Sequence, residues 1–316
     1  MPDETKTRIA GAAMVKDECD IIELFVRINS RHLDHLFVVD HCSKDRTREI
    51  LARLRAEGYP LTIYAYDHSD FQQSKVITWL VRQIAASGDY DYIITLDADE
   101  FIQPESGTFA ESVHNSLSPG ECGHIKWQSF VPAHGEYYAT DAPLYELFRP
   151  RLVENPQFFK VIIPNALAVN CTVTEGNHFI TLEGAAVTYS VVNATLQHVP
   201  VRSAEQLMGK ALIGSHRLSI KVGRGKHETT HWDDLAQRIR NNNYALTHSD
   251  VLHAALEYAS DGGNFADGKP LFADHGCIGT PEDRIVFRDL AAMDILRKFD
   301  VFAESLCREI QQLREK

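Results

Sequence analysis

The stretch YIITLDADEF, residues 92–101, is a short apolar run that ends in three acidic residues, Asp97, Asp99 and Glu100. A run of this length between polar flanks is typical of a buried β-strand. Acidic side chains are costly to bury unless a partner compensates their charge. The stretch therefore predicts a strand that ends either in a solvated turn or in a site where carboxylates hold a cation.

The residues around this stretch alternate between two hydrophobic patterns. Short apolar runs predict strands at residues 8–15, 35–40, 61–66 and 92–97. Apolar residues at helical spacing predict helices at residues 20–32, 44–58 and 74–88. Such alternation with short connections is typical of a parallel α/β sheet covered by helices on both faces. Because ligands of these sheets bind beyond the carboxyl ends of the strands, Asp40 and Asp97 are expected at the ligand-binding edge.

The pattern changes after about residue 120, where strands of mixed direction are expected at residues 123–130, 165–173, 184–192 and 195–199. Residues 131–151 are expected to form a loop, and long loops in compact domains are usually functional. From Ala204 the chain is expected to be mainly helical, and Thr280 is expected to cap a last helix. This helix is amphipathic through Leu296, Phe299, Leu306, Ile310 and Leu313. It is expected to pack on the main domain, with homodimer formation as the alternative.

Composition excludes several classes of protein. The 316 residues carry a formal net charge of −12 without a basic stripe, so a nucleic-acid partner is not expected. The six cysteines form no CxxC pair, which disfavours structural zinc and fits reduced thiols in the cytoplasm. No signal-peptide pattern and no apolar run of about 20 residues is present. The expected location is cytoplasmic, with at most peripheral contact at the inner face of a membrane.

Two carboxylates at Asp97 and Asp99 can reach one point if the chain turns after the strand. Hard cations such as Mg²⁺ and Mn²⁺ prefer oxygen ligands of this kind and keep positions open for phosphate oxygens. Acids at turns are common, so it is the position after a buried strand that favours a metal site. Glu100 either joins the metal ligands or caps the following segment.

Two further segments place acids at strand ends. In VVDHCSKDRT, residues 38–47, Asp40 is suited to accept hydrogen bonds from a ribose or a base, whereas turn and cap chemistry explains Ser43 and Asp45. In MVKDECDIIELF, residues 14–25, Glu18 is a candidate acid on the nucleotide side. No glycine fingerprint follows the first strand, which disfavours a dinucleotide-dependent oxidoreductase.

Four segments in this order resemble family 2 glycosyltransferases of the GT-A fold, in particular a bacterial subgroup with a DxDEF motif: KDECDIIELFVRIN, VVDHCSKDRTREIL, YIITLDADEF and LQHVPVRSAEQLMGK. The resemblance covers about residues 8–215 and departs from the family pattern at Asp17 and Val199. It implies a Rossmann-like, mixed but mainly parallel sheet. It also implies a nucleotide-sugar donor, Mn²⁺ or Mg²⁺, and transfer with inversion to a hydroxyl group.

The resemblance also implies roles for individual residues. Glu18 and Asp40 would contact the nucleoside, and Asp97 would lie near the ribose or the metal. The metal would be held by Asp99, with His198 completing its shell or touching the diphosphate. The residues expected near the phosphates are Arg202, Ser203 and Lys210.

Several of these assignments have alternatives. A histidine at a strand end is often structural, and His178 is a second candidate for the role of His198. Lys75, beside Gln73, is a candidate for donor contact, but a solvated charge at a helix end explains it as well. The base that takes the acceptor proton is expected in the loop downstream of the acids. Glu136 is favoured for it over two others, Asp141 and Glu146.

The predicted protein has a GT-A-like domain at residues 1–215 and a helical extension at residues 216–316 that packs on it. The domain has a nucleotide-sugar half, residues 1–105, and an acceptor half, residues 106–215. The predicted activity moves a sugar from a UDP- or GDP-sugar to a glycan, free or lipid-linked. One alternative is a sugar-phosphate nucleotidyltransferase, although GAAMVKDE lacks the glycine-rich basic loop of that class. The other is a non-catalytic glycan-binding protein.

Overall fold

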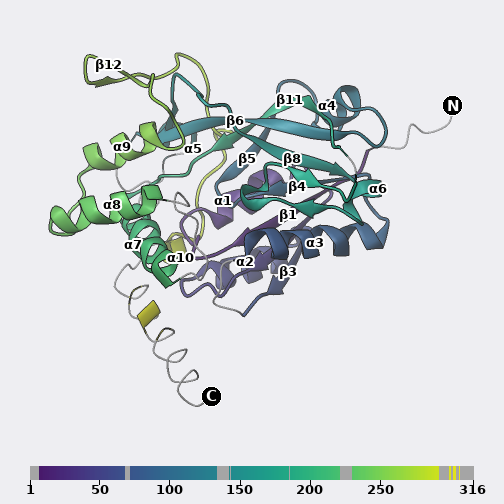
Figure 1. Ribbon diagram of the computed structural model, residues 1–316, viewed down its shortest axis with the longest axis horizontal. Coiled ribbons are helices and arrows are strands. Elements are labelled where there is room, and N and C mark those ends of the chain that lie inside the picture. Colours follow the sequence, from purple (N-terminus) through teal and green to yellow (C-terminus); the bar gives the residue numbers. More distant parts are fainter. Residues whose placement is uncertain are drawn as a thin grey trace.

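The computed structural model describes residues 7–67, 72–133, 142, 144–184, 186–220, 230–291, 299, 302–303 and 306. Its centre is one large sheet in the order β3-β2-β1-β4-β8-β6-β11-β5, with β7 paired to β6 (Figure 1). Helices cover both faces of this sheet, and three further helices, α7 to α9, gather beside it. The predicted α/β class, with a mixed sheet flanked by helices, is confirmed.

The N-terminal half of the sheet is parallel, as the alternating pattern predicts. Its strands are β1 (Ile9–Val15), β2 (His35–Asp40), β3 (Leu61–Ala65) and β4 (Tyr92–Leu96). The connecting helices are α1 (Ile22–Asn29), α2 (Thr47–Ala56) and α3 (Gln73–Ser87).

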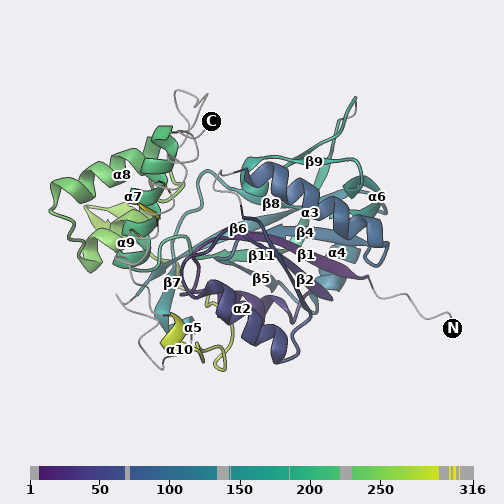
Figure 2. The ribbon, with the colours of Figure 1, turned by 90° about the horizontal axis from the view of Figure 1, so that it is seen from below.

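Strand β1 is buried along its whole length, because helices cover it on both sides (Figure 2). Its alternate residues Ala10, Ala12 and Met14 pack with α3 in one core cluster. Ile9 and Ala13 point to the opposite face and pack with α1 and α2. The central strand therefore cannot shift by one residue without moving its side chains into the wrong core.

The second half of the sheet is mixed in direction. It contains β5 (Glu100–Pro104), β6 (Cys122–Pro132), β7 (Phe148–Pro150), β8 (Phe159–Pro164) and β11 (Tyr189–His198). Strand β6 runs parallel to β11, while β8 is antiparallel to both β4 and β6. The shorter elements here are α4 (Phe109–Ser116), α5 (Leu144–Leu147), α6 (Asn165–Ala168), β9 (Thr172–Val173), a 3₁₀ turn (Glu175–Asn177) and β10 (Ile180–Thr181).

Three expectations for this half are wrong. The strand expected at residues 165–173 lies earlier, as β8, because the β-branched run up to Ile163 suits a strand and NALA after Pro164 suits the start of a helix. The two strands expected at 184–192 and 195–199 are parts of one strand, β11. The expected loop at 131–151 contains α5 and β7 in its described part.

The C-terminal part contains α7 (Ala204–Ile220), α8 (Thr230–Asn241), α9 (His248–Glu257), β12 (Phe265–Ala266), β13 (Lys269–Pro270) and α10 (Arg288–Ala291). Helix α7 runs through residues 215 and 216, where the boundary of the helical extension was expected. Among the described helices, none is long and apolar enough to cross a membrane.

The prediction that the last helix begins at Thr280 is wrong. Thr280 N and Oγ1 donate to Asp283 Oδ2 over 2.7 and 3.0 Å, and Asp283 also pairs with Arg31, just after the end of α1. This tertiary pairing closes a turn at residues 280–283, and helical structure begins only at Arg288. Of the expected amphipathic positions, Leu296, Ile310 and Leu313 lie outside the described residues.

Candidate active site

The acidic loop between β4 and β5 lies at the carboxyl edge of the sheet. Glu100 N donates to Asp97 O over 3.2 Å, and Glu100 Oε2 accepts from Asp97 N over 2.9 Å, which closes the turn. Val199 N, just past the end of β11, donates to Asp99 O over 2.9 Å. Asn29 at the end of α1 binds the start of β5 through Glu100 O. The backbone of the acids is thus held from three directions.

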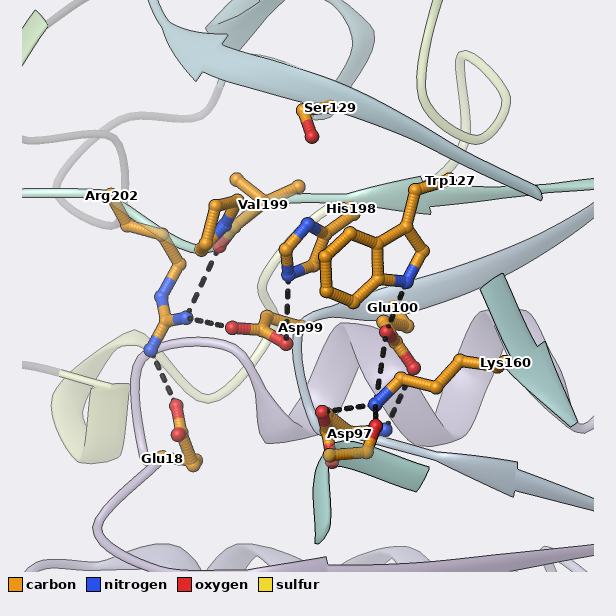
Figure 3. A network of polar contacts seen from close by, with 12 residues as sticks. Glu18, Asp97, Asp99, Glu100, Trp127, Ser129, Lys160, His198, Val199 and Arg202 are labelled. Atoms are coloured by element: carbon orange, nitrogen blue, oxygen red, sulfur yellow. Dashed lines mark hydrogen bonds and ion pairs between the residues drawn. The ribbon is translucent and has the colours of Figure 1, made fainter. Parts of the chain in front are cut away.

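Protein donors occupy both carboxylate oxygens of Asp97, and Figure 3 shows one of these donors, Lys160. Lys160 Nζ lies 2.5 Å from Oδ2, while Gln73 Nε2 and Asn177 Nδ2 each lie 3.2 Å from Oδ1. The Lys160 side chain comes from β8 and is fully buried. Burial would lower the pKa of Lys160, but the carboxylates of Asp97 and Glu100 raise it. Lys160 therefore stays charged and neutralises Asp97.

Glu100 fixes the aromatic wall of the site. Its carboxylate is fully buried, accepts from Trp127 Nε1 over 2.6 Å and lies 3.5 Å from Lys160 Nζ. Burial raises the pKa of Glu100 to about 8 against the opposing pull of Lys160. The Trp127 indole stacks on the His198 ring, with centroids 4.0 Å apart and planes 22° from parallel. Glu100 thereby orients Trp127, and Trp127 orients His198.

Asp99 has a different environment from its two neighbours. Its contacts with described charged groups are long: 3.5 Å to Arg202 Nη1, 3.6 Å to Lys210 Nζ and 3.8 Å to His198 Nε2. These distances exceed those of ordinary hydrogen bonds. Burial by itself would raise the pKa of Asp99, but Lys210 and the other cations lower it to about 2. Asp99 is therefore an ionised carboxylate whose charged neighbours lie beyond ordinary hydrogen-bond distance.

His198 faces Asp99 from the end of β11. Burial lowers the pKa of His198 to about 3 although Asp99 opposes the shift, so the ring is neutral, as in metal-binding histidines. Its Nδ1 is buried and has no hydrogen-bond partner in the described part of the chain.

These groups fit a divalent cation. Two neighbouring ligands at about 2.1 Å from one octahedral ion lie about 3 Å from each other. The 3.8 Å between Asp99 Oδ1 and His198 Nε2 is within about 1 Å of this spacing. No cluster of three histidine, cysteine or acidic ligands occurs among the described residues. An ion here would have two protein ligands, which leaves coordination positions for phosphate oxygens and water.

Arg202 ties the two sides of the site together. Its fully buried guanidinium donates to Asp20 Oδ2 from Nε over 2.8 Å and to Glu18 Oε2 from Nη2 over 2.5 Å. Nη1 donates to Val199 O over 3.3 Å. Burial raises the pKa of Glu18 to about 7, against the opposing effect of Arg202. The loop after β1 is thereby bound to the segment after β11.

The two other residues expected near phosphates differ in position. Ser203 Oγ accepts from Gln206 N over 3.2 Å and so caps the start of α7. Lys210, on the same helix, keeps about a third of its side chain exposed. Of the two, Lys210 is placed to meet a bound phosphate.

Asp40 lies at the end of β2, as expected. Its Oδ2 pairs with Arg48 Nε and accepts from Ser43 N over 3.3 Å. Its Oδ1 is buried and has no hydrogen-bond partner in the described structure. This oxygen is available to accept a hydrogen bond from a ligand.

Of the remaining described candidates, Lys75 and Glu146 are not brought together with these residues, whereas His178 packs beside Trp127. Lys75 is exposed on α3, and Glu146 is exposed on α5. His178 contacts Phe159 O through Nδ1 over 2.6 Å, and its ring centroid lies 5.6 Å from that of Trp127. The two other proposed bases, Glu136 and Asp141, lie outside the described residues.

Three site residues were not identified from the sequence: Lys160, Trp127 and Tyr258. A single lysine inside the apolar run FFKVIIP is a signal that could have indicated Lys160, because an unpaired lysine is rarely buried. Trp127 and Tyr258 carry no such local signal, and only the fold brings them to His198.

Residues 18–107 match the family model described as glycosyl transferase family 2. No curated protein matches the chain. Similar solved structures include S. aureus TarS 1–349, with 12% identity over 80% of this chain and 75% of that one and a TM-score of 0.37. Another is mannosyltransferase PcManGT from Pyrobaculum calidifontis, in complex with GDP-Man and Mn²⁺. It has 14% identity over 81% of this chain and 75% of that one, with a TM-score of 0.36. GalNAc-T7, with UDP, GalNAc and Mn²⁺, has 9% identity, coverages of 81% and 57% and a TM-score of 0.39.

Proposed function

We propose that this chain, whose residues 18–107 belong to glycosyltransferase family 2, transfers a sugar from a UDP- or GDP-sugar to a hydroxyl group of a glycan, with inversion. The observation that carries the proposal is the ionised Asp99 facing the neutral His198 across 3.8 Å at the carboxyl edge of the sheet. A site of this kind suits a metal-bound diphosphate better than an uncharged ligand.

The donor would lie along the carboxyl edge of the sheet. Its nucleoside would meet Asp40, whose buried Oδ1 lacks a hydrogen-bond partner in the described part of the chain, and Glu18 in the loop after β1. Its diphosphate would extend toward Asp99 and Lys210. Asp97, with its charge neutralised by Lys160, is suited to accept a hydrogen bond from a ribose or sugar hydroxyl rather than to hold the metal.

A divalent ion, Mn²⁺ or Mg²⁺, would be held by Asp99 and His198. When bound, such an ion acts as a Lewis acid toward the leaving diphosphate. The ionised carboxylate of Asp99 and the neutral ring of His198 suit such an ion.

In the reaction the acceptor oxygen forms a bond to the anomeric carbon while the bond from that carbon to the phosphate oxygen breaks. The electron pair of the broken bond stays on the diphosphate, beside Lys210. The acceptor proton passes to a carboxylate within hydrogen-bond reach. Glu136 is the proposed base, with Asp141 and Glu146 as the alternatives. The acceptor would be a free or lipid-linked glycan, the latter reached by peripheral contact with a membrane.

The test is to incubate the protein with a panel of nucleotide sugars and Mn²⁺ or Mg²⁺ and to measure release of nucleoside diphosphate. Asp99→Asn should abolish the release that the wild type shows, and the exposed Asp89→Asn should leave it unchanged. Equal release by Asp99→Asn and wild type would contradict the proposal. Pyrophosphate release from a nucleoside triphosphate and a sugar phosphate would indicate a nucleotidyltransferase instead. Glycan binding without any turnover would indicate a non-catalytic protein.

A further inference from the structure

Tyr258 reaches the site from a part of the chain that none of the sequence motifs covers. It follows α9 directly, and its carbonyl oxygen accepts from Arg151 Nη1 over 2.6 Å. Arg151 is itself fully buried, and its Nε donates to Glu154 Oε1 over 3.0 Å. The backbone of Tyr258 is therefore fixed to the β6–β7 side of the site.

The Tyr258 ring lies next to the proposed metal ligands. Its centroid is 5.8 Å from that of His198, with the planes at 62°. The phenol is near enough to Lys210 and Asp99 for both charges to act on its pKa. Burial raises that pKa above its usual value, so the hydroxyl keeps its proton at neutral pH and can donate it in a hydrogen bond.

The hydroxyl of Tyr258 is available to a ligand. The residue is only partly buried, and its hydroxyl makes no hydrogen bond with any described residue. Partly buried phenols in proteins normally find a polar partner for the hydroxyl. A phenol donor that packs on His198 and feels the positive charge of Lys210 is therefore suited to an anionic ligand.

The position of Tyr258 along the sheet indicates which part of the donor it meets. Asp40 marks the nucleoside end on β2, whereas His198 lies on β11, with β1, β4, β8 and β6 between the two strands. Helix α9 packs against β6, on the His198 side. Tyr258 therefore lies at the end of the site where the diphosphate and the sugar would be.

We propose that the Tyr258 hydroxyl donates a hydrogen bond to the phosphate of the donor that carries the sugar. This proposal rests on the proposed function. When the bond between the anomeric carbon and the phosphate oxygen breaks, the electron pair moves onto that phosphate. Tyr258 and Lys210 then stabilise the added charge together. The helical C-terminal part of the chain thus completes the catalytic site rather than merely packing beside it.

The test compares binding of nucleoside diphosphates and nucleoside monophosphates, UDP with UMP and GDP with GMP, by calorimetry in the presence of Mn²⁺. Loss of one hydrogen bond to a charged acceptor should weaken diphosphate binding by Tyr258→Phe about tenfold or more and leave monophosphate binding unchanged. The matched control is Tyr244→Phe, because Tyr244 is exposed between α8 and α9. It should bind both ligands as the wild type does.

The possible outcomes separate the inference from the function on which it rests. If Tyr258→Phe binds the diphosphate as tightly as wild type, the inference is wrong and the proposed function stands. A parallel loss of affinity for both ligands also overturns it, because that result indicates a disturbed fold. If the wild type binds UDP no more tightly than UMP and GDP no more tightly than GMP, the proposed function is wrong, whatever the variant does.

Discussion

Asp99 Oδ1 and His198 Nε2 lie 3.8 Å apart because β5 and β11 are paired antiparallel. The register places His198 opposite Glu100, the residue after Asp99. Two segments that are distant in the sequence are thus joined at one point by strand pairing. The stacked Trp127 then holds the imidazole in its orientation. The pair of proposed metal ligands is a product of sheet register, not of the DxD spacing alone.

Replacing Lys160 by methionine should destabilise the fold strongly. The change removes the fully buried ammonium that pairs with Asp97 and leaves both Asp97 and Glu100 without its charge. Breaking a buried ion pair in this way costs about 3–5 kcal/mol. Urea unfolding measures the change in the free energy of unfolding. Lys126→Met is the control, because Lys126 is exposed on β6 and should change stability little; a loss for Lys160→Met no larger than the control's would refute the assigned role.

The first half of the fold could be predicted because local patterns decide it. Strands such as β1 and β4 are continuous apolar runs, and helices such as α3 end at a glycine, Gly88, in the left-handed region with φ of 68°. Beyond residue 120 the pairing partners are distant, and the sequence does not show which apolar run becomes a central strand. Strand β8 was missed for this reason, although it lies between β4 and β6.

The acids of the site could be predicted because they follow buried strands. The separate roles of these acids could not be predicted, because each role depends on a side chain that a distant strand brings to it. Asp97 receives Lys160 from β8, whereas Asp99 faces His198 from β11. The turn at Thr280 could not be predicted for the same reason. The local sequence suits the start of a helix, but the pairing of Asp283 with the distant Arg31 favours a turn instead.

Replacing Arg202 by lysine should also destabilise the protein. The guanidinium donates from Nε to Asp20, from Nη2 to Glu18 and from Nη1 to the Val199 carbonyl. One ammonium group cannot reproduce this forked geometry. A loss of about 2–5 kcal/mol in the free energy of unfolding is expected. Arg53→Lys is the matched control, since Arg53 pairs with Glu49 on the exposed face of α2 and such pairs contribute at most about 0.5 kcal/mol. Equal effects of the two substitutions would contradict the buried role of Arg202.

The stability of the fold should depend on pH through His198. Its pKa is lowered from 6.5 to about 3, so between these values the unfolded chain binds a proton that the folded chain does not. The folded state is therefore destabilised as the pH falls below about 6.5, by about 1.4 kcal/mol per pH unit. Glu18 and Glu100, whose pKa values are raised, act in the opposite direction over part of this range.

The contribution of His198 is isolated by comparison with His198→Phe, which keeps an aromatic ring against Trp127. Between pH 6.5 and pH 5 the wild type should lose about 2 kcal/mol relative to the variant. Denaturant unfolding at several pH values measures this difference. His32, whose pKa is lowered to about 4 by burial, remains in both proteins and does not affect the comparison. A constant difference across this range would mean that His198 is not held neutral in the folded state.

Binding of Mn²⁺, followed by electron paramagnetic resonance in the presence of UDP or GDP, tests the central claim most directly. The wild type should bind one ion, and Asp99→Asn should bind it more than about tenfold more weakly, because it loses a direct ligand. Asp97→Asn should lose less affinity, since Asp97 is already paired with Lys160. Binding of Mn²⁺ by Asp99→Asn as tight as that of the wild type would contradict the account.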